Sequence, residues 1–194
     1  MRRLIAATLL VGVFAAPQVP VTLEAQGGWR NLFDGKTLGG WDVVGNANWS
    51  VKEGNIWASS GAGHLVTPMP YGDTQITFDF WVTPDANSGV FIRCADPKQI
   101  TAMNCYEVNI FDLRPDPAYR TGGIVNVARP LVNINTGNKW NTMDVTAKGS
   151  KFSVSINGQK MVDNAENADR PRGHITLQYG AGIVRFRNIR IRTL

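Results

Sequence analysis

The feature that most constrains this chain is a series of short runs in which apolar and polar residues alternate, separated by turn residues. Thr74–Val82 is a long run of this kind, and no stretch after residue 25 sustains the i, i+3, i+4, i+7 apolar spacing of a helix. The 20 Gly and 10 Pro suit a chain with many tight turns. Many short antiparallel strands in one domain predict an all-β sandwich or barrel.

The clearest hairpin is centred on Asn157–Gly158, which separates two alternating runs. Asn-Gly suits a type I′ turn because both central residues of that turn require positive φ. A two-residue turn pairs Ile156 with Gln159 and, in a regular register, Val154 with Met161. This register predicts that Phe152, Val154, Ile156 and Met161 share the buried face.

The last run contains an irregularity of parity. Val184 and Phe186 fall on one face of a regular strand, whereas Ile189 and Ile191 fall on the other. A β-bulge near Arg187–Asn188 would bring all four apolar side chains to the same face, so we expect one there.

The N-terminus is typical of a secretory signal peptide, which we assign to residues 1–25. Arg2 and Arg3 precede the apolar run Leu4–Ala16, which is too short to cross a bilayer comfortably. An uncleaved membrane anchor is the alternative. The remaining residues 26–194 fit a single domain, which we expect to be secreted or periplasmic and not bound to a membrane after signal removal.

The formal net charge is +5, and much of it comes from arginines near the C-terminus. A basic stripe can indicate a nucleic-acid-binding protein. These arginines, however, alternate with apolar residues, as on the solvent face of a strand, so we expect no nucleic-acid partner. The residues concerned are Arg185, Arg187, Arg190 and Arg192.

Two cysteines, Cys94 and Cys105, are close in sequence and in an exported chain favour a disulfide. Two buried free thiols are the competing interpretation. The only histidines are His64 and His174, and no CxxC spacing occurs, so we expect no metal site. No cofactor motif appears either, although a bound divalent cation stays an open alternative.

Period-2 geometry sorts the polar residues of the run that begins at Tyr106. Glu107, Asn109 and Phe111 share one face, opposite the apolar Tyr106, Val108 and Ile110. A carboxylate, an amide and an aromatic ring on one sheet face suit a carbohydrate, because the ring can stack on the sugar. Glu107 is therefore the centre of the predicted site.

Polar residues of other strands extend this prediction. Asp79 and Trp81 face away from apolar neighbours, Arg93 shares a parity with Phe91, and Gln178 shares one with Thr176. If these strands are adjacent, the predicted cleft is lined by Glu107, Asp79, Arg93, Trp81 and Gln178. The alternative is a solvated sheet face with ordinary cross-strand ion pairs.

An ordered series of short motifs extends over nearly all of residues 26–194. The motifs are Asn31–Leu38 with Gly40–Trp41, Asn87–Arg93, Tyr106–Ile110 with Asp112, Thr121–Gly122, Trp140–Asn141, Ile175–Gln178 and Phe186–Ile189. In this series the chain resembles the 3-keto-disaccharide hydrolase domain family of secreted bacterial proteins. The resemblance implies a concanavalin A-like jelly roll and activity on glycosides already oxidised to a ketone at C3.

The resemblance also implies roles for the predicted site. A 3-keto group acidifies the C2 proton, so a general base can form an enolate and expel the C1 substituent. We expect Glu107 to be this base, Arg93 or a bound cation to stabilise the oxyanion, and Asp79 or Asp112 to assist. This chain has Tyr179 where many relatives carry a histidine after the Leu-Gln pair.

Two other functions stay open at this point. The first is a non-catalytic carbohydrate-binding domain of the same fold, and the second is a surface interaction protein. Hydrolysis by a carboxylate pair is disfavoured, because Asn109 stands where alternating spacing would put a second carboxylate beside Glu107. A Gly-x-Ser-x-Gly nucleophile motif is absent from the sequence.

Overall fold

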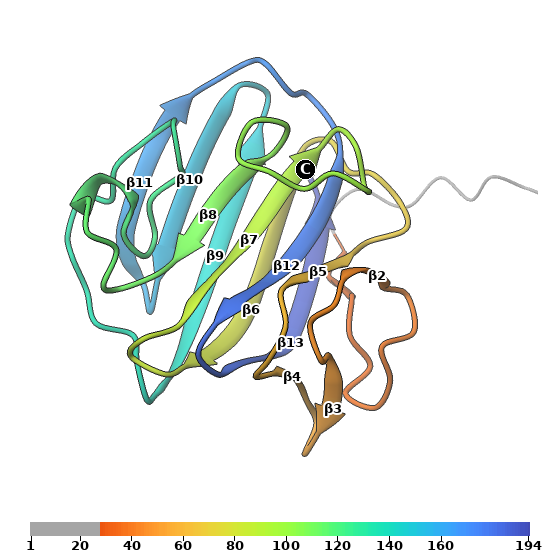
Figure 1. Ribbon diagram of the computed structural model, residues 1–194. Coiled ribbons are helices and arrows are strands. Elements are labelled where there is room, and N and C mark those ends of the chain that lie inside the picture. Colours follow the sequence, from red (N-terminus) through yellow and green to blue (C-terminus); the bar gives the residue numbers. More distant parts are fainter. Residues whose placement is uncertain (1–27) are drawn as a thin grey trace, which may run out of the picture.

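The computed structural model describes residues 28–194, which form two antiparallel sheets (Figure 1). The larger, eight-stranded sheet contains β1 (Arg30–Asn31), β3 (Ser50–Lys52), β4 (Asn55–Ala58), β6 (Thr74–Val82), β9 (Trp140–Lys148), β10 (Lys151–Ile156), β11 (Gln159–Glu166) and β13 (Val184–Thr193). Its strand order is β11-β10-β9-β6-β13-β4-β3, with β1 also paired to β13.

The smaller, five-stranded sheet contains β2 (Asp42–Gly45), β5 (Gly63–Val66), β7 (Asn87–Cys94), β8 (Tyr106–Ile110) and β12 (His174–Ala181). Its order is β2-β5-β12-β7-β8, and it lies in front of the larger sheet in Figure 1. One 3-10 turn, η1 (Pro117–Tyr119), interrupts the loop between β8 and β9. The predicted all-β jelly-roll sandwich is confirmed.

The core lies between the two sheets, because each long strand turns alternate side chains inward. Phe78 and Phe80 of β6 and Phe186 of β13 meet Val108 of β8 and Leu177 of β12 in one cluster, and all are at most 1% exposed. The face of each sheet that points away from this core is its outer face. A ligand site must lie on one of these outer faces or in the loops.

Two β-bulges change which strand residues face the core. The register of β13 against β6 shifts between Arg187 and Arg190, where Asn188 has φ 52°, so the predicted bulge is confirmed. In the β10–β11 hairpin, Ile156 pairs with Gln159 as predicted. The predicted pairing of Val154 with Met161 is wrong, because a second bulge sets Val154 opposite Val162. Met161 and Val162 are both buried as a result.

The predicted disulfide is present and joins Cys94 to Cys105. With Ile100, it packs against Phe91 on the outer face of the smaller sheet, so the 94–105 loop is fastened over that end of the sheet. The predicted signal peptide lies outside the described residues and stays a prediction. No helix within residues 28–194 is long and apolar enough to cross a membrane.

Candidate functional site

The strand β8 presents Glu107 and Asn109 on the outer face of the smaller sheet. Tyr106, Val108 and Ile110 point into the core, as the alternation predicts. β8 is the last strand of its sheet, and its free edge is covered by the following loop, where Val125 donates its backbone N–H to the Glu107 carbonyl at 2.9 Å. The backbone that carries Glu107 is therefore hydrogen-bonded on both sides.

Adjacent strands add polar and aromatic groups to the same face. In the strand register, Phe91 of β7 lies opposite Glu107, and Gly89 lies opposite Asn109. On the other side of β7, Gln178 of β12 is the partner of Gly89. Three neighbouring strands therefore bring Glu107, Asn109 and Gln178 together around a glycine, as predicted for these three residues.

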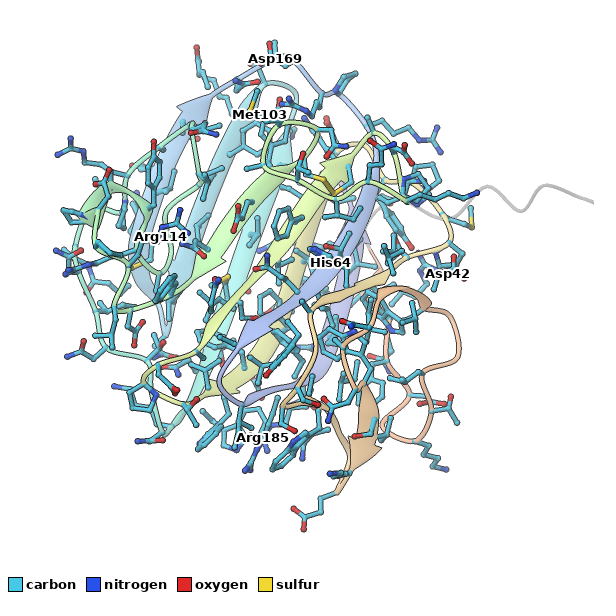
Figure 2. The ribbon with its side chains drawn as sticks, viewed as in Figure 1. Asp42, His64, Met103, Arg114, Asp169 and Arg185 are labelled. Atoms are coloured by element: carbon cyan, nitrogen blue, oxygen red, sulfur yellow. A yellow bond between two sulfur atoms is a disulfide. The ribbon has the colours of Figure 1, made fainter. Side chains whose placement is uncertain are left out.

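His64 of β5 completes this surface, and sequence reasoning missed it. It pairs with Gln178, its Nδ1 lies 3.1 Å from Oγ1 of Thr176, and its ring meets that of Phe91 edge-on at 5.1 Å. Burial lowers the pKa of His64 to about 4, so the imidazole is neutral at pH 7. Figure 2 labels it over the middle of the sheet. The sequence did contain a signal for His64: it alternates with Leu65, which is buried, so His64 is expected on the outer face.

The amides beside Gly89 are incompletely hydrogen-bonded. Oδ1 of Asn109 and Oε1 of Gln178 are buried and have no partner within residues 28–194. A Cβ at position 89 would lie 3.1 Å from the carbonyl oxygen of Val108 and 3.5 Å from Oε1 of Gln178. Glycine therefore leaves room beside the buried Oε1 of Gln178. Both amide oxygens need partners, and the hydroxyl groups of a sugar are suitable donors.

The Glu107 carboxyl group is half-buried, and this burial raises its pKa above the ordinary value of 4.5. The positive charge of Arg114 acts in the opposite direction. Arg114 follows β8 and lies 5.8 Å from the ring centroids of both Phe111 and Tyr119, and Figure 2 shows it beside this face. A carboxylate with a raised pKa near a cation can accept a proton and then retain it.

The predicted grouping of Asp79 and Trp81 with Glu107 is wrong. Both residues do face away from the core, but β6 belongs to the larger sheet, so the whole core separates them from Glu107. Asp79 accepts hydrogen bonds from Oγ1 of Thr142 at 2.8 Å and from Nδ2 of Asn188 at 2.7 Å. The prediction that both side chains face away from the core was correct, whereas the prediction that β6 lies beside β8 in one sheet was wrong.

The predicted place of Arg93 is also wrong, because it does not share the outer face with Phe91. A register shift in β7 gives Arg93 a φ of 53° and turns its side chain inward, where it is 2% exposed. The guanidinium donates to the carbonyls of Gly149 at 2.8 Å and Arg170 at 3.2 Å, and it pairs with Asp73 at 3.0 Å. Arg93 therefore binds the neighbouring loops to the end of β7.

Asp112 is engaged in holding its loop. Its carboxylate accepts hydrogen bonds from Oγ1 of Thr121 at 2.6 Å, Oγ1 of Thr136 at 2.9 Å and the backbone N–H of Gly137 at 3.2 Å. These contacts join the two ends of the loop that covers the edge of β8. An assisting role for Asp112 in proton transfer is therefore not supported by its surroundings. No cluster of three or more metal-ligating side chains occurs within residues 28–194.

Comparison with known families identifies what this arrangement belongs to. The model of the 3-keto-alpha-glucoside-1,2-lyase-like domain matches residues 28–192, which is nearly all of the described chain. The chain belongs to this family. The matched region includes the strands β7, β8 and β12, which carry Phe91, Glu107 and Gln178. No functionally curated protein matches the sequence.

Solved structures share the fold. Two proposed glycosyl hydrolases of Parabacteroides distasonis are similar to this chain. One is 22% identical with a TM-score of 0.77, and the match covers 86% of this chain and 94% of that protein's chain. The other is 25% identical with a TM-score of 0.73, covering 87% of this chain and 100% of its own. A carbohydrate-binding module, CBM66 from Bacillus subtilis, is 16% identical with a TM-score of 0.64, over 79% of this chain and 96% of its own.

Proposed function

We propose that this domain cleaves 3-keto-glycosides at the outer face of the smaller sheet, with Glu107 as the general base. The observation that carries the proposal is the Glu107 carboxyl group, which is half-buried beside Phe91 and has a raised pKa. The amide oxygens of Asn109 and Gln178 have no hydrogen-bond partner within residues 28–194, lie on the same face and suit sugar hydroxyl groups. The family assignment supplies the substrate class.

The proposed reaction is an elimination followed by hydration. The Glu107 carboxylate takes the proton from C2, and the C2–H electron pair forms an enolate with the C3 carbonyl. The enolate then re-forms the ketone, a double bond forms between C1 and C2, and the bond from C1 to the leaving oxygen breaks. That oxygen takes a proton, and water finally adds across C1 and C2, so the net result is hydrolysis.

We assign the supporting roles to other residues than those expected from the sequence. Arg114 replaces Arg93 as the cation that stabilises the developing enolate oxygen, because Arg114 is the cation that acts on Glu107. His64 is neutral at pH 7 and can donate or accept a hydrogen bond to the substrate without adding charge. It also supplies an imidazole next to Gln178, whereas Tyr179 points into the core and donates to the Gly182 carbonyl at 2.9 Å.

The test is turnover of a 3-keto-glucoside and of its unoxidised parent by wild type and by Glu107→Gln. We expect cleavage of the keto form only, and a loss of about 100-fold or more in kcat for Glu107→Gln, the usual scale for a general base. Glu166→Gln is the matched control, because Glu166 is exposed and forms only a surface pair with Lys151 at 3.8 Å. Its kcat should equal that of wild type.

A second candidate function is carbohydrate binding without catalysis. The buried amide oxygens of Asn109 and Gln178 favour it, since they have no partner within residues 28–194 and suit a bound sugar whether or not a base is present. Saturable binding of the 3-keto-glucoside with no product, in wild type and Glu107→Gln alike, would establish this alternative. Undiminished turnover by Glu107→Gln would exclude Glu107 as the base.

A further inference from the structure

A row of aromatic and cationic side chains crosses the outer face of the larger sheet, on the opposite side of the core from Glu107. Trp140 of β9 pairs with Trp81 of β6, Trp81 pairs with Arg185 of β13, and Arg185 pairs with Trp57 of β4. We call these four residues the tryptophan–arginine row. At about 4.8 Å between neighbouring strands, the row extends roughly 14 Å across the sheet.

The guanidinium of Arg185 lies between two indole rings. Its Cζ is 3.8 Å from the ring centroid of Trp57 and 4.2 Å from that of Trp81, close enough for strong cation–π attraction. The two rings hold the guanidinium from either side. Long arginine side chains are otherwise free to change rotamer, so this packing fixes the direction of the planar group.

Arg185 has no acidic partner within the described part of the chain, residues 28–194. Its Nε is buried without an acceptor within residues 28–194, and its terminal nitrogens make no hydrogen bond to these residues and are open to solvent. The neighbouring Arg187 differs, because its Nε pairs with Asp79 at 3.2 Å while it lies 3.9 Å from the Trp140 ring centroid. An apolar side chain would fill the space between the two indole rings without the free-energy cost of desolvating a charge. The guanidinium keeps hydrogen-bond donors without acceptors, and an anion is a suitable acceptor for them.

The charge around the row has the same sign. Lys52 of β3 has its Nζ 5.1 Å from the ring centroid of Trp57, on the far side of the row from Trp140. Since Asp79 compensates Arg187, the uncompensated charges at the row are those of Arg185 and Lys52. A ligand that fits must combine an anionic group for the guanidinium edge with a surface that packs on indole.

We propose that the tryptophan–arginine row is a second carbohydrate site that binds acidic polysaccharides. A carboxylate or sulfate on a sugar matches the two parallel N–H donors of a guanidinium, and the apolar face of a sugar ring packs on indole. The core separates this site from Glu107, so a polymer held here leaves the face that carries Glu107 accessible. The proposal does not depend on the reaction at Glu107.

The test is affinity gel electrophoresis of the full chain in gels that contain polygalacturonate, dextran sulfate or neutral dextran. We expect retardation by an acidic polymer and none by neutral dextran, and the two acidic gels distinguish a carboxylate from a sulfate ligand. Arg185→Gln should weaken the binding about tenfold, which corresponds to ~1.4 kcal/mol. Arg185→Lys should also bind weakly, because an ammonium keeps the charge but loses the planar pair of donors.

Arg172→Gln is the matched control, because Arg172 is exposed in the loop before β12 and its substitution removes the same charge. It should bind like wild type, and the Tm of each variant reports whether the fold is kept. If Arg185→Gln fails to fold, Arg185→Lys decides. Absence of retardation of wild type, equal binding by Arg185→Lys and wild type, or equally strong Arg185-dependent retention by double-stranded DNA would overturn the proposal.

Discussion

Replacing Asp112 by asparagine tests whether its carboxylate holds the loop in place or takes part in catalysis. The Asp112 carboxylate accepts hydrogen bonds from the backbone N–H groups of Thr136 and Gly137 on one oxygen and from hydroxyl groups of Thr121 and Thr136 on the other. An asparagine side chain has one acceptor oxygen, so its amide can face the two backbone N–H groups only through that neutral oxygen. Its NH₂ group then faces the two hydroxyl groups, which must turn and accept hydrogen bonds instead of donating them.

The expected cost follows from those contacts. Thr136 is 1% exposed, so its N–H cannot turn to water and depends on the weaker, neutral acceptor that asparagine offers. A hydrogen bond to a charged group contributes ~1.5–3 kcal/mol, and the weaker bond from Gly137 adds less, so we expect a loss of about 3 kcal/mol. For a domain of this size that loss lowers Tm by roughly 6–12 °C.

Thermal unfolding followed by circular dichroism measures this change. Asp169→Asn is the matched control, because Asp169 is exposed and its carboxylate accepts no hydrogen bond within residues 28–194; its Tm should equal that of wild type. Below the new Tm, the remaining folded Asp112→Asn protein should still cleave substrate. An unchanged Tm together with abolished turnover would refute the reasoning and make Asp112 a catalytic group.

Two further predictions concern the ends of β7 and β8. Replacing both Cys94 and Cys105 by alanine should lower the free energy of unfolding by roughly 3 kcal/mol, because the closed loop is short; urea unfolding that matches wild type would contradict this. Burial raises the pKa of Glu107, so the folded protein binds that proton more tightly than the unfolded chain. The contribution of Glu107 to stability therefore falls as pH rises from 4.5 through its raised pKa. Glu107→Gln should gain stability relative to wild type as the pH rises above 4.5, and a constant difference in urea unfolding would contradict the raised pKa.

The local features of the fold could be predicted because they depend on near neighbours in the chain. Asn157 and Gly158 have φ of 52° and 77°, as a type I′ turn requires. The opposite parities of Phe186 and Ile189 located the bulge in β13. The second bulge, beside Met161, has no such signal, because regular alternation already places Met161 on the buried face.

The prediction of which residues form the site was correct only for those on neighbouring strands of the smaller sheet. The sequence by itself determined that Glu107, Asn109 and Gln178 face away from the core, because side chains alternate along a strand. It determined the same for Asp79 and Trp81. Only the tertiary structure decided which sheet each strand joins, since pairing between distant strands depends on the packing of the whole core. Pairing of β5 with β12 brings His64 to the site, and pairing of β6 with β13 carries Asp79 and Trp81 to the opposite face of the molecule.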